Sequence, residues 1–583
     1  MNCVSPAIKA TTRRQTRQGL IPVRRRYAMQ LPVGLGMALL NLGFLLLPGA
    51  IAPHPALGAQ RVYISYGPLD FYLPISELEV YAREGKIGPQ LAFYSKYADP
   101  KQLERLRAVL LTRVNLSPVA IAQVLYSPTG EILLQRIGEV IQTKAGQPGF
   151  YAIRAALIQA AASPEGLTPL NVLKKFPTYG IRINTERSLQ IINQLSGLIN
   201  ESRLALAAVE DQSVAEASTE TALNLFQLPD IRQPGEGTWQ KQTITLNDTS
   251  RNRVFPADIY LPQDSNGRQA NLIVISHGLG GDRKTFEYLA KHLASYGFAV
   301  AVPEHPGSNA QQLRELITGF DRVVSPDREL IDRPMDVKYL LNQLGRLFPG
   351  KINLQQVGVL GQSFGGYTAL ALAGGKLNFE EIQKNCLNSD NSLNLSQLLQ
   401  CRALVLPPAD YQLHDERIKA AIAINPVTSS LFGETGVSNI KVPVMIVASS
   451  ADTVAPALSE QIQPFTWLTN PDKYLVLLRQ GTHFSTLQDS SRVVPVPPQA
   501  LGPNPQTAYE YIKALSLAFF KTNIAGDPNY KPYLSASYAQ SISEYPIPLS
   551  LVRALTAAQL TQEKDNNTPE PAPSPTPSPS PTP

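Results

Sequence analysis

One segment sets both the architecture and the chemistry of this chain: Val357-Gly358-Val359-Leu360-Gly361-Gln362-Ser363-Phe364-Gly365-Gly366-Tyr367. An apolar, β-branched run passes through Gly-x-Ser-x-Gly into the helix-forming residues 367–373, which predicts a strand, a sharp turn and a helix. Ser363 stands at the turn, and Gly361 and Gly365 flank it because a Cβ there would collide with neighbouring backbone. The helix N-terminus offers unpaired N–H groups beside the serine hydroxyl. The segment therefore predicts a nucleophile together with part of an oxyanion site.

From Trp239 onward, apolar runs alternate with stretches of helical periodicity. We expect the first two runs to pair as antiparallel strands and the later runs to lie side by side in one sheet. In order, the runs cover 239–246, 254–261, 272–276, 298–302, 357–360, 418–424, 444–448 and 474–478. Near-continuous apolar strands separated by helices are typical of a parallel sheet with helices on both faces. The predicted fold class is α/β, and in such sheets ligands bind beyond the carboxyl ends of the strands.

Three candidate catalytic residues follow predicted strand ends in the order Ser363, Asp452, His483. Asp452 comes after the run 444–448, and His483 comes after the run 474–478. Among the six histidines, only His483 follows both the serine and a strand-end acid. The order is the one expected of a hydrolase built on a nucleophile elbow. By itself Asp452 is equally well suited to capping a helix.

A second glycine-rich segment follows the first central run. His277-Gly278-Leu279-Gly280-Gly281 is expected to fold back so that the N–H of Leu279 points at the same place as the N–H of Phe364. Two such donors would form an oxyanion hole for a tetrahedral intermediate. The alternative is an ordinary glycine-rich turn into a helix.

These motifs resemble the α/β-hydrolase superfamily. Within it, SHGLGG (276–281), GQSFGG (361–366), ADTVAP (451–456) and GTHF (481–484) resemble platelet-activating-factor acetylhydrolases, dienelactone-hydrolase-like esterases and cutinase-type polyester hydrolases. The whole chain looks like a cyanobacterial group of predicted α/β hydrolases with an added N-terminal helical domain. The resemblance implies the α/β-hydrolase fold. One departure is Asn425: platelet-activating-factor acetylhydrolases take their acid after the equivalent strand, so Asp452 matches the cutinase-type pattern instead.

The implied reaction is acyl transfer through a covalent intermediate. Neutral His483 accepts the proton of Ser363 as its oxygen attacks an ester carbonyl, and Asp452 fixes the imidazole tautomer. Water then releases the acyl group. The reaction needs no metal and no organic cofactor, and a serine at this position excludes the aspartate nucleophile of dehalogenases and the cysteine of dienelactone hydrolases.

The N-terminal segment predicts export. Seven basic residues and no acidic residue lie in 1–59, so the formal charge of +6 belongs to this segment and implies no nucleic-acid-binding surface. An apolar stretch, 31–52, and the small residues 56–59 follow, as in a secretory signal peptide. The alternative is an uncleaved membrane anchor. We expect a periplasmic or secreted protein.

Cys386 and Cys401 lie close together in an insertion at about 376–416. In an oxidising compartment a disulfide between them is plausible, and the alternative is two buried thiols. Without a CxxC motif or a nearby histidine they do not suggest a metal site. The insertion is placed to cap the pocket and to select the acyl group, unless it is only a surface excursion.

The predicted organisation has six parts. They are a signal segment 1–59, a mostly helical domain 60–210 opening with a hairpin, a linker 211–237, an α/β-hydrolase domain 238–530, a C-terminal extension 531–562 and a Pro-rich tail 563–583. The helical domain carries no catalytic motif, and the tail favours extended polyproline II. The N-terminal segment or the tail would mediate any association with the membrane or the cell wall.

The leading hypothesis is a secreted serine esterase or lipase acting on a small-molecule ester or lipid. Two alternatives stay open: a peptidase or acyltransferase on the same fold, and a binding protein without catalysis.

Overall fold

The structure is a computed structural model of the 583-residue chain. It describes residues 58–66, 69–96, 98–220, 228–263, 267–321, 323, 325–387, 394–488 and 501–560. The predicted signal segment, apart from its last two residues, and the predicted Pro-rich tail lie outside these residues. Within the described ranges, no helix is both long enough and apolar enough to cross a membrane.

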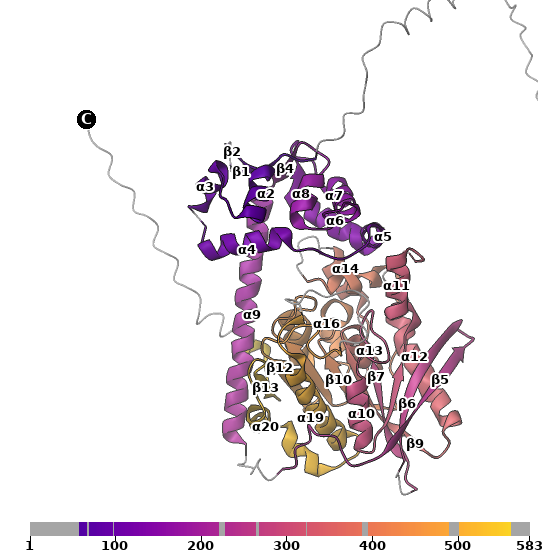
Figure 1. Cartoon of the computed structure of the whole chain (residues 1–583). Helices are drawn as coiled ribbons and strands as arrows, with labels where there is room; N and C mark the ends of the chain where they lie inside the picture. The colour runs from indigo at the N-terminus through magenta and orange to yellow at the C-terminus, as the bar shows by residue number, and fades with distance from the viewer. Residues whose placement is uncertain are drawn as a thin grey trace, which may run out of the picture. The chain divides into compact units, whose positions relative to one another are not determined.

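The α/β domain is built on a nine-stranded sheet with the order β13-β12-β11-β10-β9-β7-β8-β6-β5 (Figure 1). The central strands from β8 to β12 run parallel, whereas β5, β6 and β13 join antiparallel at the two edges. The strands are β5 Trp239–Asp248, β6 Arg253–Pro262, β7 Ala270–Ser276, β8 Ala299–Pro303, β9 Ile352–Gln362, β10 Ile418–Ile424, β11 Val444–Ser449, β12 Lys473–Leu478 and β13 Leu549–Val552. This arrangement confirms the predicted fold class, including the antiparallel pair that leads into the sheet.

Both faces of the sheet are apolar because side chains alternate along each strand. In β7, Leu272 and Val274 face one core with α12 and α13, whereas Ile273 and Ile275 face a second core with α10 and α19. The helices of this domain are α10 Glu287–Ser295, α11 Ala310–Thr318, α12 Glu329–Leu347, α13 Phe364–Leu372, α14 Phe379–Leu387, α15 Gln397–Gln400, α16 Ser429–Val437, α17 Gln463–Trp467, α19 Pro505–Asn523 and α20 Ala536–Ser541. Buried on both sides, the strands can tolerate few polar residues, so polar side chains concentrate at the strand ends.

The predicted C-terminal extension belongs to the sheet, which corrects the domain boundary at 530. Strand β13 pairs antiparallel with β12, and α20 packs against the same strand. A four-residue strand among turn residues gives too weak a pattern to be recognised from the sequence.

The N-terminal domain carries a small sheet of its own, with the order β2-β1-β4-β3. The expected hairpin is present, but β3 and β4 were not predicted, because strands of three and four residues give little periodicity. Asp99, Ser117, Ser127 and Thr168 each cap a helix that begins with Pro, the residue favoured at that position. The elements are β1 Arg61–Tyr66, β2 Leu69–Pro74, α2 Ile75–Glu84, α3 Pro89–Ser95, α4 Pro100–Leu111, α5 Pro118–Tyr126, α6 Pro128–Val140, β3 Ile141–Thr143, α7 Phe150–Ala162, α8 Pro169–Lys175 and β4 Gly180–Ile183.

A long helix, α9 (Thr185–Thr219), follows this domain and lies beside β13 and α20 (Figure 1). It continues nine residues into the segment 211–237 that was predicted as linker. Val209 is fully buried in the α/β core, and the Glu216 carboxylate accepts hydrogen bonds from the backbone N–H groups of Arg553 and Ala554. These contacts explain why the helix persists where its own sequence shows no apolar stripe.

Candidate active site

Ser363 sits at the tip of a strained turn between β9 and α13. Its backbone has φ 56° and ψ −117°, a conformation that costs a non-glycine residue free energy. A Cβ on Gly365 would lie 2.0 Å from the Ser276 carbonyl oxygen, and one on Gly361 would lie 2.0 Å from the Gly365 carbonyl oxygen. The two glycines therefore allow the close backbone approach that the sequence predicts for a nucleophile elbow.

His483 and Asp452 are in direct contact. His483 Nδ1 lies 2.6 Å from Asp452 Oδ2, and the other carboxylate oxygen accepts from the N–H groups of Val454 and Ala455 at 2.8 Å each. The Asp452 side chain is fully buried, and that of His483 is 6% exposed. The carboxylate is thus held from both sides, with one oxygen left for the imidazole, which fixes the orientation of the ring.

Gln362 connects the elbow to the histidine loop. Its side-chain amide donates to the backbone oxygen of His483 at 3.1 Å, and it immediately precedes Ser363. Among the described residues, the Ser363 hydroxyl makes no direct hydrogen bond to His483. In free enzymes such contacts are commonly loose and tighten when substrate binds. The structure therefore brings the serine and histidine segments together without a hydrogen bond between the two side chains.

The loop after β7 lies directly against the elbow. A Cβ on Gly278 would lie 2.4 Å from Gln362 Oε1 and 3.4 Å from Ser363 Cβ. The turn and loop hydrogen bonds of the described residues leave the N–H groups of Leu279 and Phe364 without an acceptor, whereas the N–H of Gly280 donates to the Ser308 carbonyl oxygen at 2.8 Å. Free N–H groups beside a nucleophile are what an oxyanion hole requires.

Asn425 occupies the end of β10, where some hydrolases carry their acid. It is fully buried, with φ 42°, and its amide nitrogen lies 3.4 Å from the Thr482 carbonyl oxygen. A neutral amide cannot stabilise an imidazolium as a carboxylate does. Asn425 thus contacts the histidine loop, and the carboxylate that contacts the His483 ring belongs to Asp452.

Two further histidines lie beneath the site. His277 Nε2 accepts a hydrogen bond from the backbone N–H of His305 at 3.0 Å, and both side chains are buried. Burial first, and the Arg333 charge second, lower the pKa of both imidazoles well below the usual range. Both histidines are therefore neutral at pH 7, and both are buried within the structure.

Sequence reasoning missed Arg333, a fully buried residue of α12 that contacts the loop after β7. A signal was present: Glu329, Arg333 and Asp336 recur at helical spacing on the face that the apolar pattern assigns to the core. Charged residues at such positions are retained only with extensive polar contacts.

A disulfide and a buried carboxylate hold the insertion in place. Cys386 and Cys401 form a disulfide. The fully buried Glu460 accepts from the side-chain amides of Asn394 and Gln400 and from the backbone N–H of Thr428. The insertion is therefore fixed to the loop that follows β10.

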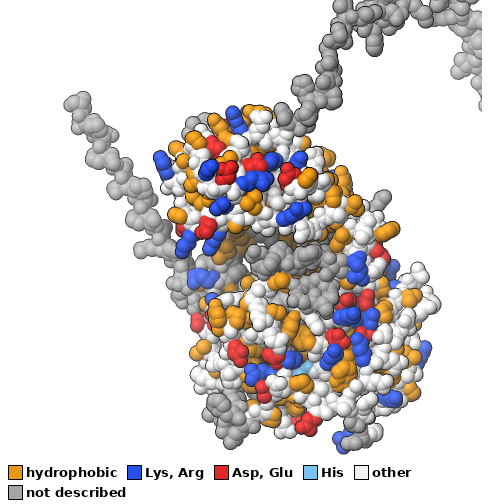
Figure 2. Space-filling view, in the orientation of Figure 1, with side chains coloured by type: hydrophobic (Ala, Val, Ile, Leu, Met, Phe, Trp, Pro, Cys, Tyr) orange, Lys and Arg blue, Asp and Glu red, His pale blue; other side chains and the backbone are white. Residues whose placement is uncertain are grey.

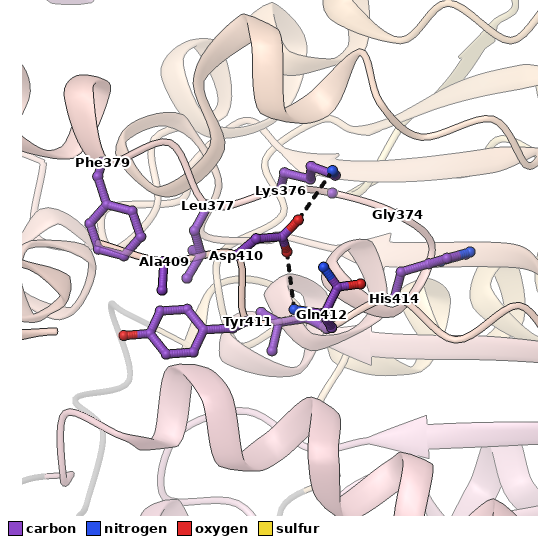
Figure 3. A pocket seen from close by; sticks show the side chains of 11 residues that line it. Gly374, Lys376, Leu377, Phe379, Ala409, Asp410, Tyr411, Gln412 and His414 are labelled. Atoms are coloured by element: carbon purple, nitrogen blue, oxygen red, sulfur yellow. Dashed lines mark hydrogen bonds and ion pairs between the residues drawn. The ribbon is translucent and has the colours of Figure 1, made fainter. Parts of the chain in front are cut away.

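A hollow of about 1210 Å³ lies between α9, the insertion and the loop after β11. Leu195, Leu198 and Trp467 supply apolar lining, and Asp452 borders it; neither Ser363 nor His483 is among the described lining residues. A smaller cavity of about 270 Å³ lies between the segment that follows α13 and residues 409–414, where Lys376 and Asp410 form an ion pair of 3.4 Å (Figure 3). Its lining residues, 374–377, 379 and 409–414, include none of the catalytic candidates.

The electrostatic surface is mixed. Basic and acidic side chains are interleaved over the face seen in Figure 2. Over the described ranges, no group of three or more His, Cys, Asp or Glu side chains is arranged to hold a metal ion.

Two family models match parts of the chain. Residues 58–184 match a family described as alpha/beta hydrolase of unknown function (DUF1400), and residues 252–319 match platelet-activating factor acetylhydrolase, isoform II. The first match covers the N-terminal domain, and the second runs from β6 to the residue after α11, including the loop with Leu279. The chain resembles α/β hydrolases in both sequence and fold, and these likenesses identify it as a hydrolase.

Proposed function

We propose that this hydrolase cleaves carboxylic esters through Ser363, His483 and Asp452. The observation that carries the proposal is the strained turn at Ser363, joined through Gln362 to the loop of a histidine that pairs with a buried carboxylate. A hydroxyl in this position, beside unpaired N–H groups, is suited to attack an acyl carbonyl. The match to an acetylhydrolase family supports an ester as the substrate.

In this mechanism, His483 accepts the Ser363 proton through Nε2 while the serine oxygen attacks the carbonyl carbon. Asp452 keeps the Nδ1–H tautomer and stabilises the imidazolium. The N–H groups of Leu279 and Phe364 receive the developing oxyanion, each contributing about 3 kcal/mol to the barrier reduction. The imidazolium then protonates the leaving alcohol, and a water activated by His483 releases the acid.

A fluorophosphonate probe tests the nucleophile. The wild type should be labelled at Ser363, and Ser363→Ala should lose both the label and at least ~10³-fold of its turnover of p-nitrophenyl esters. Ser450, two residues before Asp452, accepts a hydrogen bond from the backbone N–H of Gln480 through its hydroxyl. Ser450→Ala is the matched control and should behave as wild type. Undiminished turnover by Ser363→Ala would remove the proposal.

A substrate panel tests the ester. We expect p-nitrophenyl esters to be cleaved faster than the matching anilides, and water to be preferred over added alcohols as the acyl acceptor. Preference for anilides would indicate a peptidase, and dominant transfer to alcohols would indicate an acyltransferase. Comparing acetyl with palmitoyl esters measures the acyl length that the site takes.

We further propose that the enzyme works outside the cytoplasm. The basic and apolar segment 1–59 and the disulfide between Cys386 and Cys401 support export to an oxidising compartment. Cell fractionation with antibody detection would separate a released protein from one held at the membrane or the cell wall. Recovery of a full-length protein in the cytoplasm, with free thiols at both cysteines, would contradict this assignment.

A further inference from the structure

Arg333 is a buried cation whose hydrogen bonds all go to neutral oxygen atoms. Its side chain is fully buried, and it forms no ion pair within the described residues. The guanidinium donates to Ser308 Oγ at 3.0 Å, Thr368 Oγ1 at 3.2 Å and Ser276 Oγ at 3.3 Å, and also to the backbone oxygen of His277. Burying an unpaired charge is costly, so a cation in this position calls for a reason other than stability.

The contacts of Arg333 reach both sides of the proposed oxyanion hole. On one side it holds the carbonyl of His277, two residues before Leu279. On the other side its guanidinium carbon lies 4.5 Å from the centre of the Phe364 ring, and Thr368, which it also contacts, donates to the Phe364 carbonyl oxygen at 2.9 Å. One side chain therefore links the loop after β7 to the first turn of α13.

A chain of neutral groups connects Arg333 to the carboxylate of Asp336, three residues further along α12. Because Arg333 donates to Ser276 Oγ, this hydroxyl donates in turn to His305 Nε2 at 3.0 Å, and His305 Nδ1 faces Asp336 Oδ2 at 3.0 Å. Since His305 is neutral, the last contact is a hydrogen bond and not an ion pair. This chain of groups has the same residue types and order of contacts as a catalytic triad. Its three side chains are fully buried, so substrate cannot reach them (Ser276, His305 and Asp336).

The cation stays charged at neutral pH. Burial lowers the pKa of Arg333 to about 10, while the charges of Glu329 and Asp336 act in the opposite direction. Glu329 is reached through Ser308, whose hydroxyl donates to its carboxylate at 2.6 Å. The hydrogen-bonded path to Glu329 thus runs through one neutral residue and that to Asp336 through two. The guanidinium itself directly contacts the Phe364 ring and the His277 carbonyl oxygen.

We propose that Arg333 is a positioning residue that holds the Leu279 and Phe364 N–H groups in register and lends positive potential to the oxyanion they receive. This inference rests on the proposed function, because it assigns a role within the same site. Interactions made only as negative charge develops raise kcat without changing substrate binding. Loss of the guanidinium should therefore lower kcat and leave KM nearly unchanged.

Arg333→Met and Arg333→Lys in the full chain test the role. We expect Arg333→Met to lower kcat for a short p-nitrophenyl ester by at least ~100-fold with KM changed less than ~3-fold, and Arg333→Lys, which keeps the charge, to recover at least ~10-fold of that loss. The matched control is Arg251→Met, which breaks ion pairs with Asp248 and Asp336 in the outer part of the same cluster. It should lower the unfolding temperature comparably while leaving kcat within about twofold.

Three kinetic results would overturn the inference. The first is an Arg333→Met kcat within threefold of wild type, and the second is a loss of kcat in Arg333→Met and Arg251→Met that is proportional to the loss of unfolding temperature. The third is a kcat of Arg333→Lys no higher than that of Arg333→Met. If Arg333→Met does not fold, Thr368→Val replaces it, because it removes the hydroxyl between Arg333 and Phe364 while keeping the shape; an unchanged kcat would then count against the role. Hydrogen exchange of residues 277–281 gives a readout independent of turnover, and we expect faster exchange in the variants. A wild type that neither turns over esters nor labels at Ser363 would refute the proposed function instead, and unchanged exchange would refute the positioning role by itself.

Discussion

The side-chain amide of Gln362 donates a hydrogen bond of 3.1 Å to the backbone oxygen of His483. Gln362 is 1% exposed and is the last residue of β9, directly before Ser363, so this bond fixes the distance between the histidine loop and the turn at Ser363. The relationship is local to the serine but decides the placement of a residue more than a hundred positions later in the chain.

Gln362→Glu is expected to impair catalysis more than Gln362→Leu. The carboxylate would place an acceptor against the His483 carbonyl oxygen in a buried site, whereas leucine only removes the bond; an unsatisfied buried polar group costs about 1–3 kcal/mol. We expect kcat to fall ~10-fold for the leucine variant and ~100-fold for the glutamate variant. Steady-state kinetics on a p-nitrophenyl ester measure both. Gln356→Glu, at an exposed position of the same strand, is the control. Equal kcat values for the two Gln362 variants would argue against this bond as the cause.

Asn425→Asp is expected to damage the site and not to supply a second acid. The Asn425 amide nitrogen faces the Thr482 carbonyl oxygen, so an aspartate would set two acceptors against each other in a fully buried position. We predict a loss of about 1–3 kcal/mol in unfolding free energy and lower activity.

Asp452→Asn should lose ~10⁴-fold in kcat because it favours the wrong imidazole tautomer of His483, and adding Asn425→Asp to this variant should restore no activity. Recovery of activity in the double variant would show that the acid can act from the end of β10.

The strands that carry the catalytic candidates were predictable because they are buried on both faces. A run such as 418–424 is apolar at almost every position, and the polar residue that breaks it, followed by glycine or a turn, marks the strand end where chemistry is placed. Ser363, Asp452 and His483 were chosen as candidates in this way, since each follows such a run. The order of Asp452 and His483 along the chain suggested that the two side chains pair. Only the structure gives the distance between them, 2.6 Å from His483 Nδ1 to Asp452 Oδ2.

Other parts escaped prediction for physical reasons. Strands β3 and β13 are too short to show a period, and α9 continues past 210 because distant partners, such as the backbone N–H of Arg553, stabilise it. The helical spacing of Glu329, Arg333 and Asp336 places these charges on the core face of α12, but it does not identify their partners. Only the packing shows that four oxygen atoms surround the Arg333 guanidinium.

Removing the disulfide of the insertion is expected to change acyl-chain selection. Cys386 and Cys401 are separated by 15 residues, and a crosslink over such a loop contributes about 3 kcal/mol to its stability. The insertion provides Asn394 and Gln397 to the lining of the large hollow beside Asp452. We predict that Cys386→Ser/Cys401→Ser shifts the kcat/KM ratio of palmitoyl to acetyl esters at least ~5-fold, with kcat for the acetyl ester within twofold of wild type. Treating wild type with a reductant should reproduce the shift. An unchanged ratio would leave the insertion without a role in selecting the acyl chain.

The stability of the α/β domain is expected to fall with pH below neutrality because of His292. This residue of α10 is 3% exposed, and burial, followed by the charge of Lys513, lowers its pKa to about 4. The pKa of a histidine in the unfolded chain is near 6.5, so the folded state favours the neutral form of His292. The contribution to stability is complete above pH ~6.5 and is lost as the pH falls toward 4, because the unfolded chain binds the proton first. The loss of unfolding free energy between pH ~6.5 and pH 4 that is due to His292 amounts to ~3 kcal/mol at most. In urea unfolding of the full chain followed between pH 4 and 8, His292→Leu should flatten the pH dependence by up to that amount while matching the wild-type transition shape at pH 8. A variant whose pH dependence overlays that of wild type would show that His292 is not the group that titrates.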